Sequence, residues 1–135
     1  MAHIAVIGSV ARDEVIRLTE PLRAGTHLNG VAAEARMGGG GANTAVALAA
    51  AGHEVSLLAA VGQDAVGDVL LAELAAAGVD TAAISRLDRP TTRSLLLIDP
   101  TGERTVVNVA RCEDAAPSER LLDLPADAVY VRSRR

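Results

Sequence analysis

The chain has 135 residues, half of them hydrophobic, and a formal net charge of −4, a composition that predicts one soluble globular domain. Its 13 basic residues are all arginine and lie scattered along the sequence, which argues against a nucleic-acid-binding surface. Without a long apolar run or a signal-peptide pattern, we expect a cytoplasmic protein that does not contact a membrane. A single cysteine and isolated histidines indicate neither a disulfide nor a metal site.

The first predicted element is a buried strand at His3–Ile7, an apolar run that ends at Gly8. Asp13 follows shortly after this strand. Because ligands of open parallel sheets bind at the carboxyl ends of the strands, Asp13 is a candidate contact for a hydroxylated ligand. The alternative role of Asp13, a turn cap, stays open on spacing alone. Two runs of alternating polarity, residues 14–18 and 30–37, then predict half-exposed strands.

Residues 38–41 are consecutive glycines, and the alanine-rich run after them predicts a helix over residues 42–51 with Gly52 as its stop. A helix N-terminus offers unpaired N–H groups, glycine lets a ligand approach the backbone, and the Asn43 amide both donates and accepts hydrogen bonds. These properties favour a small-molecule site over the alternative, a flexible surface loop. The run does not match the dinucleotide-binding pattern GxGxxG, and a chain without lysine cannot form a Walker A loop.

Residues 54–61 predict a second buried strand, and Asp64 is expected to cap a helix that ends at Gly78. For Asp64 we favour this capping role over a catalytic one. Strands that alternate with helices over short connections predict a parallel α/β sheet.

After residue 90 the pattern changes to two strand-like runs, residues 93–98 and 103–110. The segment Asp99-Pro100-Thr101-Gly102 between them is typical of a type I turn, so the two runs predict a hairpin. A short helix at residues 117–122 and another buried strand at Ala128–Val131 complete the predicted elements.

Four motifs, in their order and spacing, resemble the N-terminal half of the ribokinase-like sugar kinases, the PfkB carbohydrate kinase family. They are GSVARD at residues 8–13, GGGGAN at 38–43, GQDAVG at 62–67, and TT at 91–92 with TGER at 101–104. The resemblance implies an α/β fold, with an incomplete ribokinase-like parallel sheet core and a projecting β-strand lid near residues 14–18, 30–37 and 93–110. It also implies a site for a sugar or nucleoside, formed by Asp13, Gly38, Gly39, Gly40 and Asn43.

The resemblance further implies phosphoryl transfer from ATP, with Mg²⁺, to a sugar hydroxyl. In such kinases the catalytic base and the anion hole belong to a C-terminal Gly-Ala-Gly-Asp signature, which these 135 residues lack. We therefore expect residues 1–135 to be the N-terminal part of such a kinase domain, inactive alone, with the ATP and Mg²⁺ sites and the catalytic residues outside this chain. We also expect that it forms a homo-oligomer through the lid strands.

Two departures from the family pattern leave the sugar undefined, namely Gly40 where lysine is frequent and Ala11 where asparagine is frequent. Two alternatives to a kinase part stay open. One is a non-catalytic remnant that binds a protein partner through its lid strands. The other is an ordinary α/β domain in which the glycine run is structural.

Overall fold

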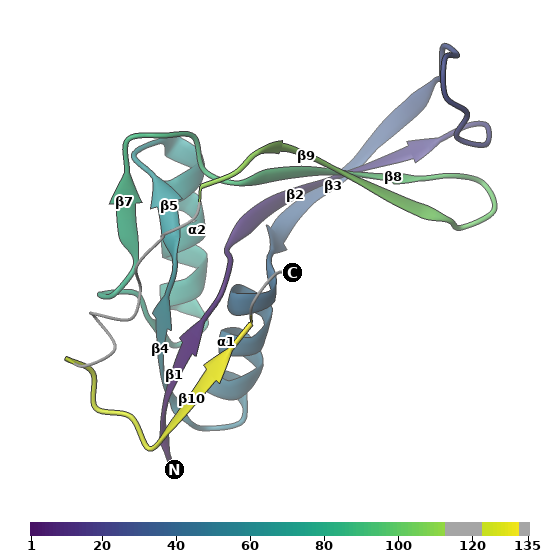
Figure 1. Ribbon diagram of the computed structural model, residues 1–135. Coiled ribbons are helices and arrows are strands. Elements are labelled where there is room, and N and C mark those ends of the chain that lie inside the picture. Colours follow the sequence, from purple (N-terminus) through teal and green to yellow (C-terminus); the bar gives the residue numbers. More distant parts are fainter. Residues whose placement is uncertain (113–122, 133–135) are drawn as a thin grey trace.

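The computed structural model describes residues 1–112 and 123–132. Figure 1 shows an α/β core from which a long, twisted sheet projects. The core sheet has four parallel strands in the order β10-β1-β4-β6. These strands are β1 (His3–Ile7), β4 (Glu54–Leu58), β6 (Val79–Asp80) and β10 (Ala128–Val131).

Two helices, α1 (Gly40–Ala50) and α2 (Ala65–Ala76), share one apolar cluster with the core sheet. Val6 and Leu57, register partners in β1 and β4, are fully buried in this cluster. The helices contribute small and branched side chains to it, namely Ala42, Ala45, Leu70 and Leu74. Both predicted helices are confirmed, although α1 starts two residues before the predicted position. Among the described residues, no helix is long and apolar enough to cross a membrane.

The projecting sheet joins segments that are far apart in the sequence, in the order β3-β2-β8-β9. Its strands are β2 (Ala11–Leu18), β3 (Gly30–Gly38), β8 (Arg93–Ile98) and β9 (Arg104–Ala110), which confirms the four predicted runs. β2 pairs antiparallel with β3, and β8 pairs antiparallel with β9. The parallel pairing of β2 with β8 unites the two hairpins into one sheet. At the predicted turn, the Gly102 N–H donates to the Asp99 carbonyl at 2.9 Å.

The prediction of one strand over residues 54–61 is wrong. This run divides into β4 and β5 (Ala60–Gly62), and β5 pairs with β7 (Ser85–Leu87) rather than with the core sheet. The chain changes partners at Ala59, whose carbonyl accepts a hydrogen bond from the Ser85 N–H at 2.9 Å. A continuous apolar run gives no sign of this change, because the residues on both sides of Ala59 are mostly buried.

The predicted burial of Ala128–Val131 is also wrong. These residues form β10, but all four are exposed, and Val131 is 59% exposed. β10 is the last strand of the core sheet, and within the described residues it pairs with β1 alone. An apolar strand is buried only where other elements cover both of its faces. The helix predicted at residues 117–122 lies outside the described residues.

Candidate functional site

The projecting sheet joins the start of α1 through β3 (Figure 1). Asp13 and the glycines of the predicted site meet there. The register pairs Ala11 of β2 with Gly38 of β3, so Asp13 lies on the same sheet face, diagonal to Gly38. A Cβ atom added to Gly38 would overlap the Asp13 carboxylate. Because glycine has no side chain, position 38 leaves room for the Asp13 side chain.

The start of α1 requires glycine for two physical reasons. Gly39, the N-cap residue, has a φ of 95°, and a Cβ atom there would overlap the Ser9 carbonyl. The helix begins at Gly40, and the Ala42 N–H donates to the Ser9 carbonyl at 3.1 Å. Helix geometry leaves the Gly40 N–H without an acceptor in the helix, so it can bind a polar group of a ligand, whereas Gly41 is buried against the Gly8 backbone.

Asn43 lies in the first turn of α1 and has an exposed side chain. Its backbone N–H donates to the Gly39 carbonyl at 3.0 Å, and its exposed side-chain amide can both donate and accept hydrogen bonds. A carboxylate, an amide and helix N–H groups can together bind the hydroxyl groups of a sugar, which both donate and accept. The structure places the predicted residues at one junction of β2, β3 and α1, namely Asp13, Gly38, Gly39, Gly40 and Asn43.

Two opposing effects act on the Asp13 carboxyl. Burial raises the pKa of Asp13, and the guanidinium groups of Arg36 and Arg104 lower it by a smaller amount. Arg36 is the β3 register partner of Asp13, and Arg104 is the first residue of β9. Sequence analysis does not single out either arginine, because only the pairing of the strands brings them near Asp13.

A third arginine, Arg132, lies beside the start of α1. Its backbone N–H donates to the Ile7 carbonyl at 2.8 Å, which extends the pairing of β10 with β1. A Cβ atom added to Gly40 would meet the Arg132 side chain, with the Cγ atom at 2.6 Å. The sequence does not predict this contact either, because no local pattern links residue 132 to the glycines.

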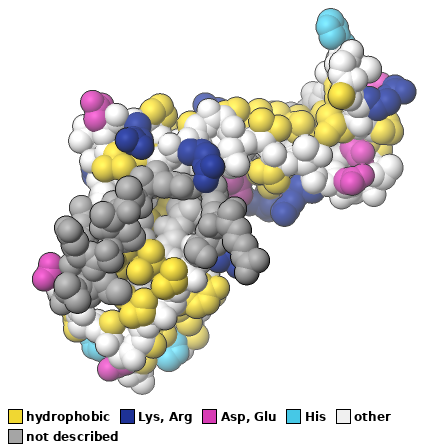
Figure 2. Space-filling model, in the orientation of Figure 1, with side chains coloured by type: hydrophobic (Ala, Val, Ile, Leu, Met, Phe, Trp, Pro, Cys, Tyr) yellow, Lys and Arg dark blue, Asp and Glu magenta, His cyan; other side chains and the backbone are white. Residues whose placement is uncertain are grey.

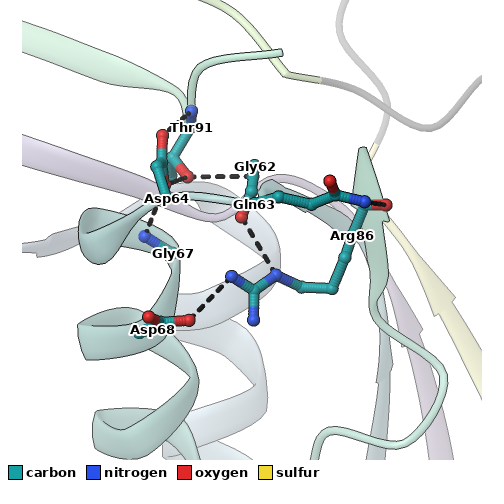
Figure 3. Close-up of polar contacts among 7 residues, drawn as sticks. All are labelled: Gly62, Gln63, Asp64, Gly67, Asp68, Arg86 and Thr91. Atoms are coloured by element: carbon teal, nitrogen blue, oxygen red, sulfur yellow. Dashed lines mark hydrogen bonds and ion pairs between the residues drawn. The ribbon is translucent and has the colours of Figure 1, made fainter. Parts of the chain in front are cut away.

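Asp64 forms a second polar cluster, at the N-terminus of α2 (Figure 3). Its Oδ1 atom accepts hydrogen bonds from the Gly67 N–H at 2.8 Å and from the Thr91 hydroxyl at 2.5 Å. Its Oδ2 atom accepts from the Thr91 N–H at 2.9 Å, and the Thr91 hydroxyl oxygen accepts from the Gly62 N–H. The predicted capping role of Asp64 is thus confirmed, and the same carboxylate fixes the segment that leads into β8.

Neighbouring contacts secure both ends of the β8–β9 hairpin. The Thr92 hydroxyl oxygen accepts from the Cys112 N–H at 2.8 Å, and the Thr92 carbonyl accepts from the Arg12 N–H of β2 at 2.9 Å. From β7, Arg86 donates to the Gly62 carbonyl at 3.0 Å and to Asp68 at 2.7 Å (Figure 3). Together with the Asp64–Thr91 hydrogen bonds, which reach the segment before β8, these contacts join the projecting sheet and β7 to the N-terminus of α2.

The described residues contain no group of three or more His, Cys, Asp or Glu side chains that could hold a metal ion. An open hollow of about 330 Å³ lies beside the Asp64 cluster and includes none of the predicted sugar-binding residues. The residues that line it are Gln63, Asp64, Leu87, Asp88, Arg89 and Pro90. The placement of the ATP and Mg²⁺ sites outside this chain stays a prediction.

Comparison with known proteins shows the family and the fold of the chain. The pfkB family carbohydrate kinase profile matches residues 1–132, so the chain belongs to this family. Its fold is the ribokinase-like α/β fold.

Two curated ribokinases are similar to the chain. It is 32% identical to the ribokinase of Bacillus subtilis over 114 residues, which cover 84% of this chain and 39% of that protein. It is 30% identical to the ribokinase of Haemophilus influenzae over 105 residues, which cover 77% of this chain and 34% of that protein. The chain thus spans well under half the length of these relatives.

Among solved structures, a ribokinase from Cryptococcus neoformans in complex with ADP is 34% identical to the chain. The TM-score is 0.73, and the match covers 80% of this chain and 34% of that one.

We predict that Asp64→Ala lowers the free energy of unfolding by about 0.5–2 kcal/mol, the cost of losing an N-cap side chain. Burial raises the pKa of Asp64, but hydrogen bonds from Thr91 and Gly67 outweigh it, so the folded-state pKa lies below the unfolded one. The stabilisation is therefore complete above the unfolded pKa of about 3.9 and is lost as the pH falls through the lower folded pKa.

Urea unfolding at neutral and at acidic pH measures both effects. The control variant Asp68→Ala removes an exposed carboxylate from the same helix and should cost less at neutral pH. Equal unfolding free energies for Asp64→Ala and the unmodified chain at neutral pH would contradict the role of Asp64.

Proposed function

We propose that residues 1–135 are the sugar-binding part of an ATP-dependent carbohydrate or nucleoside kinase, which transfers the γ-phosphate of ATP to a sugar hydroxyl. The observation that carries this proposal is the placement of the Asp13 carboxylate beside Gly38, close to the N-terminus of α1. A sugar at this junction would donate a hydroxyl hydrogen bond to Asp13 and accept hydrogen bonds from Asn43 and the helix N–H groups.

In this proposal the projecting sheet is the lid over the sugar. Asp13 belongs to β2 of that sheet, whereas Gly40 and Asn43 belong to the core. The sugar would therefore lie between the lid and the core, and closure of the lid would exclude water from the reacting hydroxyl.

We further propose that the 135 residues alone have no kinase activity. Catalysis of phosphoryl transfer depends on positioning the nucleotide and on stabilising the charge of the transferred group. The described residues provide no metal-binding group, and the sequence contains no Gly-Ala-Gly-Asp segment to supply a base and an anion hole. Loss of a general base alone costs typically about 10²–10⁴-fold in rate.

Isothermal titration of the purified chain with a panel of pentoses, hexoses and nucleosides tests this function. We predict that one sugar class binds and that Asp13→Asn, which keeps the shape of the side chain, weakens its binding about 10- to 150-fold, as for a lost charged hydrogen-bond partner. The control variant Glu73→Gln, an exposed position on α2, should bind like the unmodified chain. A coupled assay with ATP should show no turnover.

Two results would contradict the proposal. If no sugar or nucleoside binds, or if Asp13→Asn binds as well as the unmodified chain, the junction is not the sugar site. If the chain phosphorylates a sugar and a substitution in this chain abolishes that turnover, the prediction that the 135 residues alone have no kinase activity is wrong.

A homo-oligomer formed through the lid strands is the second part of the proposal. The edge strand β9 exposes three valines, Val106, Val107 and Val109, at 41–51%. Figure 2 shows apolar side chains in a band along the projecting sheet. Unpaired strand edges and apolar patches promote association between chains. The same surface favours the alternative function, a non-catalytic chain that binds a protein partner.

We predict that the chain associates in a concentration-dependent manner and that Val107→Lys shifts it towards the monomer in sedimentation experiments. Val69→Lys, on the exposed side of α2 at 46% exposure, is the matched control and should leave association unchanged. A monodisperse monomer at all concentrations would contradict association through these strands. A chain that is monomeric and also binds no sugar would favour the alternative function, a non-catalytic chain that binds a protein partner.

A further inference from the structure

Arg132 brings a charged side chain from the core sheet to the start of α1. It directly follows β10, and its backbone N–H donates to the Ile7 carbonyl at 2.8 Å, so it lies at the carboxyl ends of β10 and β1. In open parallel sheets, ligands bind beside the carboxyl ends of the strands. The backbone of Arg132 is therefore on the side of the core where the predicted sugar site lies.

Two glycines make room for the Arg132 side chain. A Cβ atom added to Gly8 would lie 3.3 Å from the Arg132 Cβ atom. A Cβ atom added to Gly40 would lie 2.6 Å from the Arg132 Cγ atom, 3.2 Å from Cδ and 3.0 Å from Nε. The Arg132 side chain thus passes over both glycines, and it occupies the space where a side chain of residue 40 would begin.

The guanidinium group of Arg132 is available to a ligand. Arg132 is exposed, and it takes part in no ion pair or side-chain hydrogen bond among residues 1–112 and 123–132. Arg93, by contrast, is held by the Glu14 carboxylate. A helix N-terminus carries partial positive charge, so it does not attract a guanidinium group. An oxygen atom of a ligand that accepts hydrogen bonds at this place would offset the repulsion.

Asp13 and Arg132 lie beside the two ends of one short segment. The Asp13 carboxylate lies at Gly38, and the Arg132 side chain lies at Gly40. Since consecutive Cα atoms are about 3.8 Å apart, the Cα atoms of these glycines are at most about 7.6 Å apart. No ion pair joins the two side chains to each other in the described part of the chain. An acceptor and a donor are therefore present within the reach of one sugar.

We infer that Arg132 is a further sugar-binding residue, which donates to one hydroxyl oxygen of an uncharged sugar while Asp13 accepts from another hydroxyl. Residue 40 is then glycine because a side chain there would displace Arg132. This inference rests on the proposed function. A carboxylate only accepts and a guanidinium group only donates, whereas a hydroxyl group does both. The two charges offset each other, so an uncharged ligand fits between them better than an ion.

Isothermal titration of the 135-residue chain with D-ribose, D-fructose and adenosine tests this inference, and the tightest of the three is then titrated into each variant. Arg132→Met keeps an unbranched side chain over Gly40 but removes the donors, and it should weaken binding about tenfold, as for a lost hydrogen bond to a charged group. Arg132→Lys keeps a charged donor and should weaken binding less. A side chain that only packs against the glycines would not give this order.

The double variant Arg132→Ala/Gly40→Lys tests whether the two side chains share one space. Removal of the Arg132 side chain makes room for a lysine at residue 40, whose amine should restore most of the affinity that Arg132→Ala alone loses. Arg23→Met is the matched control, since it removes an exposed arginine from the loop between β2 and β3, and it should bind like the unmodified chain. Thermal unfolding of each variant establishes that it is folded.

Three outcomes would overturn the inference. If a sugar binds and Arg132→Met binds it as well as the unmodified chain, the Arg132 side chain only packs, and the proposed function stands. If Arg132→Lys is as weak as Arg132→Met, or if Gly40→Lys restores nothing, a positive donor at this place does not bind the sugar. If none of the three compounds binds, the proposed function fails and the inference fails with it.

Discussion

The structure depends on a close backbone contact between the start of α1 and the connection from β1 to β2. A Cβ atom at Gly41 would lie 2.6 Å from the Gly8 carbonyl carbon, and one at Gly8 would lie 2.6 Å from the Gly41 Cα. A side chain at either position would push the start of α1 away from the connection between β1 and β2. Since β3 leads directly into α1, the same contact fixes where β3 ends, and with it the position of Gly38 beside Asp13. The candidate site is a consequence of how the backbone packs.

The Asp64 cluster gives the projecting sheet a second attachment. The contact of α1 with β1 holds the β2–β3 hairpin, whereas Asp64 and Thr91 hold the β8–β9 hairpin against α2. The two hairpins then pair through β2 and β8, so each attachment limits the movement of the other. Asp13 on β2 and Arg104 on β9 therefore keep their relative positions only while both attachments hold. The geometry of the proposed sugar site therefore depends on Asp64 and Thr91, which lie outside it.

The sequence predicts those features that local chemistry determines. The glycines at residues 38–41, the cap at Asp64 and the turn at Asp99 to Gly102 each carry a short-range signal, and the structure contains all three. Pairing between distant segments carries no such signal. The change of partner at Ala59, the exposure of β10 and the approach of Arg36 and Arg104 to Asp13 all depend on which strands become neighbours. The sugar-binding role of Asp13, Gly38, Gly39, Gly40 and Asn43 stays a prediction.

The central claim is that a sugar binds where β2, the end of β3 and the first turn of α1 meet. Mapping of backbone amide chemical shifts during titration with the sugar that binds tests this claim most directly, because each amide reports its own surroundings. We expect the largest shifts at Asp13, at Gly38 to Asn43 and at Arg36, with small shifts at Gln63, Asp88 and Arg89 around the open hollow. Saturable shifts confined to that hollow, with none at the glycines of α1, would contradict it.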